Sequence, residues 1–395
     1  MKEAIEIIDW KKQFSSADNC LLHSIESGIP TAIWRLPNQN QVVGIIDFHH
    51  QQDHFINDLD NTDPGFIINA FDQHHPSKAT SIRADVMVEW SQSQPQDFTV
   101  KVAPRVSASD IESLLDDNPN TRRQFVNGSD TQSHDYEKTV RQALEEIAAG
   151  TFTKVVLSRF EDTTLREDFD IMRFFDKACA SYPNAFCYLL YTPAHGLWMG
   201  ASPETLLSME DGLFQTMSLA GTQRLDNRSL QDIAWTQKDI EEQAMVSRYI
   251  IDCFKKIRLR EFEENGPRTA LAGNLVHLKT TYKVDTRKVE AEQLATTMMN
   301  LLHPTSAVCG MPLQPALDFI KQYEQYDRKL YAGFLGPVNI KGLTHLFVNL
   351  RCMEIIDSKH ARLYAGAGIT ADSDPHKELM ETQMKMNTLK KLMES

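Results

Sequence analysis

A helical period of apolar residues opens the strongly patterned part of the chain. In residues 136–150, "YEKTVRQALEEIAAG", Val140, Leu144 and Ile147 form one stripe, and Gly150 marks the predicted end of the helix. A strand, "KVVLS", follows at once. Further helices are predicted at about 171–182, 231–256, 315–325 and 375–393.

Short apolar runs separated by turn residues predict antiparallel strands. Residues 184–201 and 204–222 each predict two strands, joined by Ala-His-Gly and Glu-Asp-Gly turns. Residues 333–369 predict three strands, with turns at Lys341-Gly342 and Asp357–His360. Connections this short join antiparallel neighbours, because parallel pairing needs a long crossover. The predicted fold class is therefore α+β with large antiparallel sheets.

Composition places the chain among ordinary globular proteins. It has 395 residues, of which 42% are hydrophobic and 24% charged, and its net charge of −13 argues against nucleic-acid binding. Six scattered cysteines without C-x-x-C pairing indicate a reducing compartment. The N-terminus lacks the apolar core of a signal peptide, and no apolar run approaches a membrane span. We expect a cytoplasmic protein that binds neither nucleic acid nor membrane.

The pattern is uneven along the chain. Residues from about 105 to 135 are rich in Asp, Asn and Ser, as is typical of a poorly ordered segment. This segment separates a weakly patterned N-terminal portion, 1–130, from the strongly patterned remainder, 131–395. We expect the two portions to form one integrated domain.

Two predicted helices carry carboxylates on the face that should pack inward. In "LYAGAGITADSDPHKELMETQMK" a strand runs into a Gly-Ala-Gly loop and then a helix, where Glu378, Glu381 and Lys385 share one side. In the helix around 231–256, Glu242 shares a stripe with apolar residues, and Asp239 precedes it by one turn. A buried carboxylate is costly unless it is paired or bound to a metal. One interpretation is a shared Mg²⁺, and the other is a set of edge residues that are solvated or paired with lysines.

At this point the residues resemble a known family. The blocks "KVVLSR", "GASPETL", "LAGTQ", "KDIEEQ", "VHL", "LHPTSAVCGMP", "RKLYAGFLGPV", "VNLRCMEI" and "LYAGAGITADSDPHKELMETQMK" are similar, in order, to those of the chorismate-utilising enzymes. The resemblance is dense from about 136 to 395 and faint before that. It implies layered antiparallel sheets flanked by helices, with chorismate and Mg²⁺ in the cleft between the sheets. Residues 131–395 would be the chorismate-binding catalytic region, and 1–130 the N-terminal portion of the same fold.

The resemblance also assigns roles to individual residues. Glu242 and Glu381 fall on the family's metal-ligand positions, and Asp239 and Glu378 would hold metal-bound water. The ring carboxylate of chorismate would meet Lys385 and the N–H groups around Gly366 and Gly368. Arg351 and Tyr331 would hold its enolpyruvyl carboxylate, although a surface arginine and a core tyrosine are the plain alternatives. The remaining expected pocket residues are Ala220, Gly221, Thr222, His277 and Ala307.

Within the family, the nucleophile that attacks the ring differs between members. Members that use ammonia resemble one another in carrying Gln at the position of Lys154, whereas water-using members carry Lys there as general base. Glu204 falls on the general-acid position, which would protonate the departing 4-hydroxyl group. The plain alternatives are a strand-edge lysine and a turn glutamate. Gln243 departs from the family pattern, because many relatives place His after the glutamate.

Two further positions help to distinguish between the reactions that members of the family catalyse. Ala220 stands where some relatives carry a nucleophilic lysine, so a covalent route is not expected. Ala307 stands where pyruvate-releasing relatives tend to carry Thr, which favours stopping at isochorismate. The expected activity is therefore Mg²⁺-dependent conversion of chorismate into isochorismate, and the alternative is salicylate formation with loss of pyruvate.

Other readings of the sequence involve partners or a different metal. An amidotransferase subunit is not expected, because Lys154 indicates water as the nucleophile, and the chain is expected to be a monomer. The histidine-rich segments "FHHQQDHF" (48–55) and "DQHHP" (72–76) allow zinc ligands of a hydrolase. Neither segment has fixed ligand spacing on a clear helix, so solvated loops are the preferred interpretation.

Overall fold

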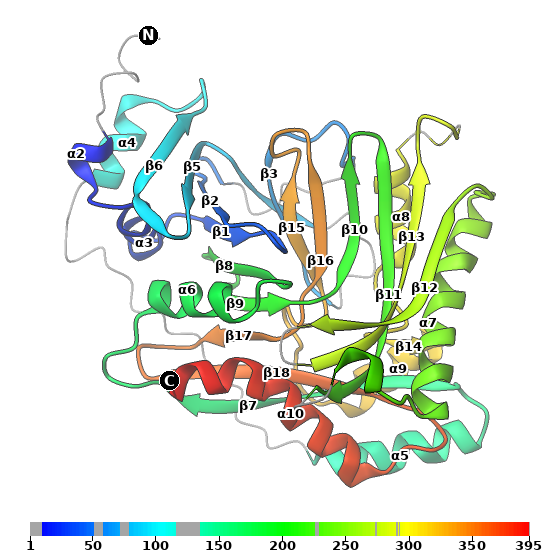
Figure 1. The fold of residues 1–395 in the computed structure, drawn as a ribbon. Coiled ribbons are helices and arrows are strands. Elements are labelled where there is room, and N and C mark those ends of the chain that lie inside the picture. Colours follow the sequence, from blue (N-terminus) through cyan, green and yellow to red (C-terminus); the bar gives the residue numbers. More distant parts are fainter. Residues whose placement is uncertain are drawn as a thin grey trace.

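Two large antiparallel sheets form the framework of the protein (Figure 1). The structure is a computed structural model, which describes residues 10–50, 58–71, 79–115, 135–225, 229–272, 275–289, 291 and 293–394. The expected α+β class with layered antiparallel sheets flanked by helices is confirmed. Each helix in the described ranges is too short or too polar to cross a membrane.

In the described ranges the first sheet has ten strands and combines N-terminal and C-terminal parts of the chain. In spatial order the strands are β14 (Gly310–Met311), β7 (Lys154–Thr164), β18 (His360–Ile369), β17 (Cys352–Ile355), β9 (Gly196–Ser202), β8 (Phe186–Thr192), β1 (Thr31–Arg35), β2 (Gln41–Ile46), β5 (Val86–Ser91) and β6 (Gln94–Val102).

The second sheet has eight strands among the described residues and is built mostly from the middle of the chain. In spatial order these are β12 (Glu263–Ala272), β13 (Leu275–Asp285), β11 (Leu213–Arg224), β10 (Thr205–Glu210), β16 (Thr344–Val348), β15 (Phe334–Val338), β3 (Gly65–Asn69) and β4 (Thr80–Arg83).

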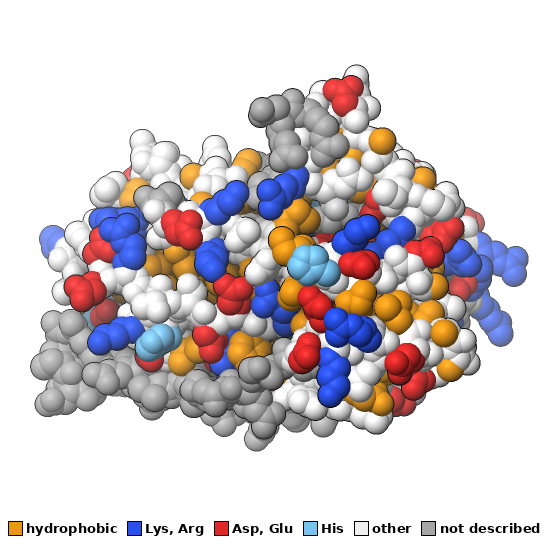
Figure 2. Space-filling view, turned by 90° about the horizontal axis from the view of Figure 1, so that it is seen from below, with side chains coloured by type: hydrophobic (Ala, Val, Ile, Leu, Met, Phe, Trp, Pro, Cys, Tyr) orange, Lys and Arg blue, Asp and Glu red, His pale blue; other side chains and the backbone are white. Residues whose placement is uncertain are grey.

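Helices cover the outer faces and ends of the sheets. They are α2 (Trp10–Gln13), α3 (Ala17–Glu26), α4 (Ala108–Leu115), α5 (Tyr136–Ala148), α6 (Ile171–Ser181), α7 (Gln237–Lys256), α8 (Leu294–Leu302), α9 (Leu313–Tyr323) and α10 (Pro375–Glu394), with the short 3₁₀ helix η2 (Leu230–Asp232) before α7. Helix α7 lies beside β11 and β13, and Figure 1 shows α10 and α5 beneath β7 and β18. On the face that Figure 2 shows, acidic and basic side chains are interspersed.

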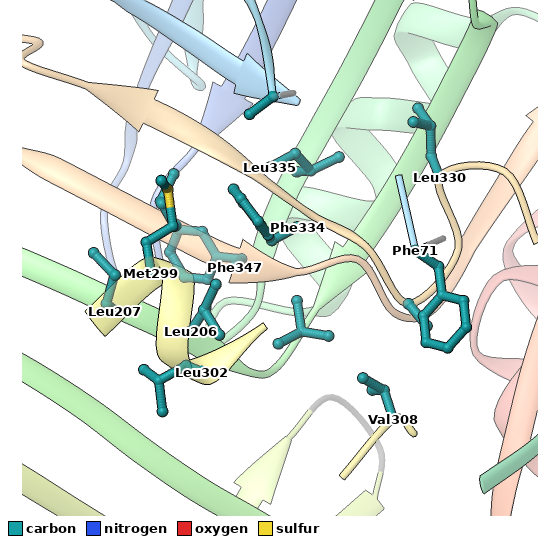
Figure 3. Close-up of a cluster of buried hydrophobic side chains, with 14 of the residues drawn as sticks. Phe71, Leu206, Leu207, Met299, Leu302, Val308, Leu330, Phe334, Leu335 and Phe347 are labelled. Atoms are coloured by element: carbon teal, nitrogen blue, oxygen red, sulfur yellow. The ribbon is translucent and has the colours of Figure 1, made fainter. Parts of the chain in front are cut away.

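The core next to the candidate site joins the second sheet to α8. Phe334 and Leu335 of β15, Phe347 of β16 and Met299 of α8 are buried together (Figure 3). Phe347 stacks on Phe186 of the first sheet, with ring centroids 4.0 Å apart, so the same cluster links the two sheets. This buried cluster therefore holds the two sheets together next to the site.

Three sequence predictions need correction. The predicted middle strand of residues 333–369 is two strands, since β16 lies in the second sheet and β17 in the first. The glycines of "AGAGI" lie inside β18, where they pair with β7, and do not form a loop. Part of the segment at 105–135 is the helix α4, whose Ile111 and Leu114 are buried; its residues 116–134 lie outside the described ranges.

Candidate active site

One pocket brings together side chains from both sheets and two helices. Its walls come from β7 and β18 of the first sheet, β11 and β13 of the second sheet, and α7 and α10. The sequence-proposed residues that line it are Glu204, Ala220, Gly221, Thr222, Glu242, His277, Ala307, Tyr331, Arg351, Gly366, Gly368, Glu381 and Lys385. The lining does not include three other residues proposed from the sequence, Lys154, Asp239 and Glu378.

Lys154 is the first residue of β7 and is fully buried, which rules out a strand-edge lysine. Its Nζ lies 2.9 Å from Oε1 of Glu242 on α7, a close ion pair without the angles of a directed hydrogen bond. Burial alone would raise the pKa of Glu242. The ammonium groups of Lys154, Lys385 and Lys238 outweigh that effect and lower it. The pair therefore places a charged carboxylate at the pocket wall.

Glu204 has the opposite protonation preference. It lies between β9 and β10 and is 3% exposed, with its backbone held by a hydrogen bond from the Val348 N–H to its carbonyl oxygen (3.0 Å). Burial raises the pKa of Glu204 to about 8, although Lys154, Arg351 and Lys385 act to lower it. At neutral pH the carboxyl group therefore holds a proton that it can donate into the pocket.

Gly366 and Gly368 turn one edge of β18 toward the pocket. Their partners on β7 are Ser158 and Val156, whose N–H groups bond to Glu324 Oε1 (2.7 Å) and Cys309 O (2.7 Å), away from β18. In an antiparallel pair both members of such a couple point away from each other, so the polar groups of the two glycines point away from β7. Accordingly, Lys385 Nζ donates to Gly366 O at 2.8 Å.

Close approach explains why these positions carry no side chain. A Cβ atom on Gly368 would lie 2.6 Å from Oε1 of Glu242 and 2.9 Å from Cε of Lys154. A Cβ atom on Gly366 would lie 2.9 Å from the hydroxyl of Tyr331. All three contacts are shorter than van der Waals packing allows, so the glycines let α7, Lys154 and Tyr331 lie against the strand.

Arg351 lies where the chain crosses from one sheet to the other. Its φ of 51° is in the left-handed region, which a non-glycine residue rarely adopts, and it falls in the gap between β16 and β17. In the described ranges its guanidinium forms no ion pair with a carboxylate, so it can bind a carboxylate of a ligand. Tyr331 beside it is 4% exposed and stacks on Tyr364, with ring centroids 5.7 Å apart.

His277 offers an uncharged hydrogen-bond acceptor. Its Nδ1 lies 2.6 Å from Gly221 O, and because a carbonyl only accepts, Nδ1 carries the proton. Burial, followed by the charge of Arg351, lowers the pKa of His277 to about 3. Nε2 is buried without a protein partner in the described part of the chain. Gly221 itself lies at an irregularity of β11 with φ 64°, which turns residues 220–222 toward the pocket.

The acidic residues divide into two groups. Glu242 and Glu381 face the pocket, with Glu381 Oε1 2.7 Å from Nζ of Lys385. Glu378 is 2% exposed and pairs with Lys238, and Asp239 caps its own helix by accepting from the backbone N–H of Thr236 at 3.1 Å. Lysine pairing, one of the two interpretations from the sequence, is thus present, and two of the carboxylates nevertheless face the same pocket.

These donors fit Mg²⁺ by their chemistry. Mg²⁺ in proteins takes one or two carboxylates and keeps several waters, and α7 and α10 bring two carboxylates, Glu242 and Glu381, to one pocket. No cluster of three or more His, Cys, Asp or Glu side chains suited to a metal occurs among the described residues.

The first histidine-rich segment is partly described and has structural contacts. His49 Nδ1 lies 2.9 Å from Asp85 Oδ2, and His50 Nδ1 lies 3.4 Å from Asp47 Oδ2, at the end of β2. These contacts tie the turn after β2 to the start of β5. Residues 51–57 and 72–78 lie outside the described ranges.

Sequence reasoning missed the apolar walls of the pocket. Pro203, Leu219, Val308, Leu350 and Tyr364 line it together with the residues named above. Apolar residues are common in any core, so their composition carries no signal for a binding site. Only their position beside the quoted motifs could have indicated them.

Comparison with known proteins gives a consistent family. The sequence model described as "Chorismate binding enzyme" matches residues 11–394. The isochorismate synthase EntC of Escherichia coli (strain K12) is 30% identical over 279 residues, which cover 68% of this chain and 70% of the relative. The isochorismate synthase DhbC of Bacillus subtilis (strain 168) is 30% identical over 277 residues, covering 66% and 68%.

A solved structure matches over almost the whole chain. MenF, the menaquinone-specific isochorismate synthase from Escherichia coli, superimposes with a TM-score of 0.74 at 21% identity, covering 95% of this chain and 90% of that chain. At this level of identity the match establishes the fold alone.

Proposed function

We propose that this chain, which belongs to the family of chorismate-binding enzymes, is an isomerase that converts chorismate into isochorismate. The relatives named as isochorismate synthases support this assignment. The observation that carries it is the pocket itself, where a buried amine, Lys154, stands behind a carboxylate while a second carboxyl group, Glu204, keeps its proton. Water addition and loss of hydroxide need one group of each kind.

Binding of chorismate would use the positive groups of the pocket. Chorismate carries two carboxylates, and Arg351 and Lys385 supply two cations there. The planar guanidinium of Arg351 suits a carboxylate through two parallel hydrogen bonds. The outward-facing backbone of Gly366 and Gly368 adds N–H donors without side chains in the way. Recognition of the substrate is thus local, against the net charge of −13 of the whole chain.

The chemical step balances one water added and one water lost. In its neutral form Lys154 takes a proton from the water that attacks C2 of the ring. The double bonds shift, the bond between C4 and its hydroxyl breaks, and Glu204 gives its proton to the departing oxygen. The net change is an isomerisation, and the proton taken up by Lys154 returns to Glu204 through solvent.

Glu242 and Glu381 would hold Mg²⁺ beside the ring carboxylate. A bound Mg²⁺ would supply positive charge that offsets the substrate's negative charge. Coordination by Glu242 would also weaken the pairing of that carboxylate with Lys154. Asp239 and Glu378 would contribute indirectly. Asp239 would hold the start of α7, and Glu378 would hold Lys238.

Product identity tests the proposal. Purified protein is incubated with chorismate and Mg²⁺ and the mixture is separated by liquid chromatography, with no ammonia source and no second subunit added. We expect isochorismate, in equilibrium with chorismate, and loss of turnover on chelation with EDTA that added Mg²⁺ restores. Accumulation of salicylate together with pyruvate would replace the proposal by salicylate synthesis, and a requirement for ammonia would replace it by an aminating reaction.

A further inference from the structure

Gln243 is the first buried residue of α7. It is 2% exposed and directly follows Glu242, whereas the other buried residues of the helix, Val246, Ile250, Cys253 and Phe254, all lie further along. Apolar packing therefore holds the C-terminal part of α7. At the end that carries Glu242, the buried attachment to the sheet is the side chain of Gln243.

This side chain ties the helix to two neighbouring strands. Its Nε2 donates to Ser218 Oγ on β11 at 2.8 Å and to Thr280 Oγ1 on β13 at 3.0 Å. Both hydroxyl residues are essentially fully buried, at 0% and 1% exposure. One turn further along α7, Ser247 Oγ lies 3.0 Å from the same Ser218 hydroxyl.

The same two strands form a wall of the pocket. Ala220 lies two residues beyond Ser218 on β11, and His277 lies three residues before Thr280 on β13. Gln243 therefore fixes the distance between the helix that carries Glu242 and the strands across from it. On the opposite side, toward β18, Glu242 has little room to shift, because a Cβ atom on Gly368 would lie 2.6 Å from its Oε1.

An amide at this buried position has an energetic cost. Oε1 of Gln243 is buried without a hydrogen-bond partner in the described ranges. A buried polar atom left unpaired destabilises the fold, and an apolar side chain of the same length would avoid that penalty. Stability of the fold alone therefore does not account for the amide. A need to hold α7 at a fixed distance from β11 and β13 does account for it.

We infer that Gln243 is a positioning residue that sets how far Glu242 reaches into the pocket, and through it the affinity for the divalent cation. This inference rests on the proposed function. The residue that departs from the family pattern in the sequence thus has a defined task here: it links α7 to β11 and β13 through a group that is uncharged at every pH. Partners that orient metal ligands typically contribute 10- to 100-fold in metal affinity.

Direct cation binding tests the inference without relying on turnover. Isothermal titration calorimetry with Mg²⁺ is run on the full chain as wild type, Gln243→Met, Gln243→His and Ser247→Ala. Gln243→Met keeps the length but removes the donor, and we expect its dissociation constant for Mg²⁺ to rise about tenfold. Gln243→His, measured at pH 8, restores a neutral donor, so we expect it to recover most of that loss. Ser247→Ala is the matched control, which leaves Gln243 and its bonds in place.

Turnover at varied Mg²⁺ gives the second readout. For Gln243→Met we expect the Mg²⁺ concentration at half-maximal rate to rise in parallel, while kcat at saturating Mg²⁺ stays close to that of the wild type. A folded Gln243→Met with wild-type Mg²⁺ affinity overturns the inference, as does an equal loss in Ser247→Ala. Should Gln243→Met fail to fold, Gln243→Asn, whose shorter amide cannot span to both hydroxyls, takes its place under the same criteria.

The controls separate this inference from the proposed function. A wild-type protein that makes isochorismate and binds Mg²⁺, with an unaffected Gln243→Met, rejects the role of Gln243 alone. A wild-type protein that shows no Mg²⁺ binding, with and without chorismate present, rejects the metal-dependent function and this inference with it.

Discussion

At the scale of single residues, the pocket sets two carboxyl groups to opposite charge states. Glu242 is paired with Lys154 and its pKa is lowered, whereas Glu204 is enclosed and its pKa is raised to about 8. The difference is one of environment, since both side chains have the same chemistry. Titratable groups whose environments separate their pKa values in this way are the usual signature of acid and base roles.

Replacing Lys154 by Gln should remove water addition and leave chorismate binding largely intact. The amide cannot take a proton, and general-base catalysis contributes about 10²- to 10⁴-fold. We expect kcat to fall by at least about 100-fold in a stopped-time chromatographic assay. Lys329→Gln is a matched control, because Lys329 also pairs with a buried glutamate, Glu354 (2.7 Å), but lies outside the pocket lining. Near wild-type turnover of Lys154→Gln would remove Lys154 from its role.

The rate should depend on pH through Glu204. With a pKa of about 8, its carboxyl group is protonated below that pH and loses its proton as the pH rises through it. We expect kcat/KM for chorismate to decline above about pH 8, because the free enzyme then lacks the proton donor. Glu204→Gln should lose most activity and show no such decline. A decline of the same shape in Glu204→Gln would assign the titration to another group.

At the scale of elements, the site depends on how closely α7 approaches β18. Gly368 lies in a strand, and its φ is not in the left-handed region, so the need for glycine there is one of space. The hydrogen-bonding pattern of β18 with β7 leaves its glycine edge facing the pocket. A strand thus stands where a loop was expected, and its outward-facing backbone lines the pocket.

Gly368→Ala should therefore damage the site without unfolding the strand. The new methyl group would meet Glu242 Oε1 at 2.6 Å and Lys154 Cε at 2.9 Å, so both side chains must move. A displacement of about 1 Å in catalytic geometry costs roughly 100-fold in rate, and we expect a loss of that order in kcat/KM. Thermal unfolding followed by circular dichroism checks that the fold is retained. Unchanged kinetics would show that Glu242 and Lys154 have more freedom than their contacts indicate.

At the scale of the whole molecule, the N-terminal portion is part of both sheets. In the first sheet β1 pairs with β8, and in the second sheet β3 pairs with β15. Both partner strands are buried along their whole length, so neither is a natural sheet edge. The weak pattern of residues 1–130 hid this, because strands buried on both faces show no alternation of apolar and polar positions.

A chain that begins at residue 131 should consequently not fold. Removal of 1–130 would leave β8 and β15 with unpaired, apolar edges that favour aggregation. We expect the truncated chain to be insoluble or to elute as aggregate in size-exclusion chromatography, without a cooperative thermal transition. A soluble truncated chain with cooperative unfolding and turnover would show instead that 131–395 is an independent catalytic domain.

The sequence by itself determined several helices and, through a family resemblance, many of the polar residues that line the pocket. Local periodicity places α5, α6, α9 and α10 within a few residues of their observed bounds, because each helix is specified by its own stripe and caps. The resemblance of motifs such as "KDIEEQ" and "SPETL" to blocks of the family pointed to Glu242 and Glu204, and both residues line the pocket. These are properties of short stretches of chain.

Only the tertiary structure decided what each of these groups experiences. The edge of β18 that faces the pocket and the anchoring of Gln243 depend on partners at least 25 positions away in the chain. The break at Arg351 depends on the pairing of β16 and β17 into different sheets. The high pKa of Glu204 and the low pKa of His277 arise from burial by several elements at once. Desolvation and close contact are set by packing in three dimensions, and no local pattern of residues encodes them.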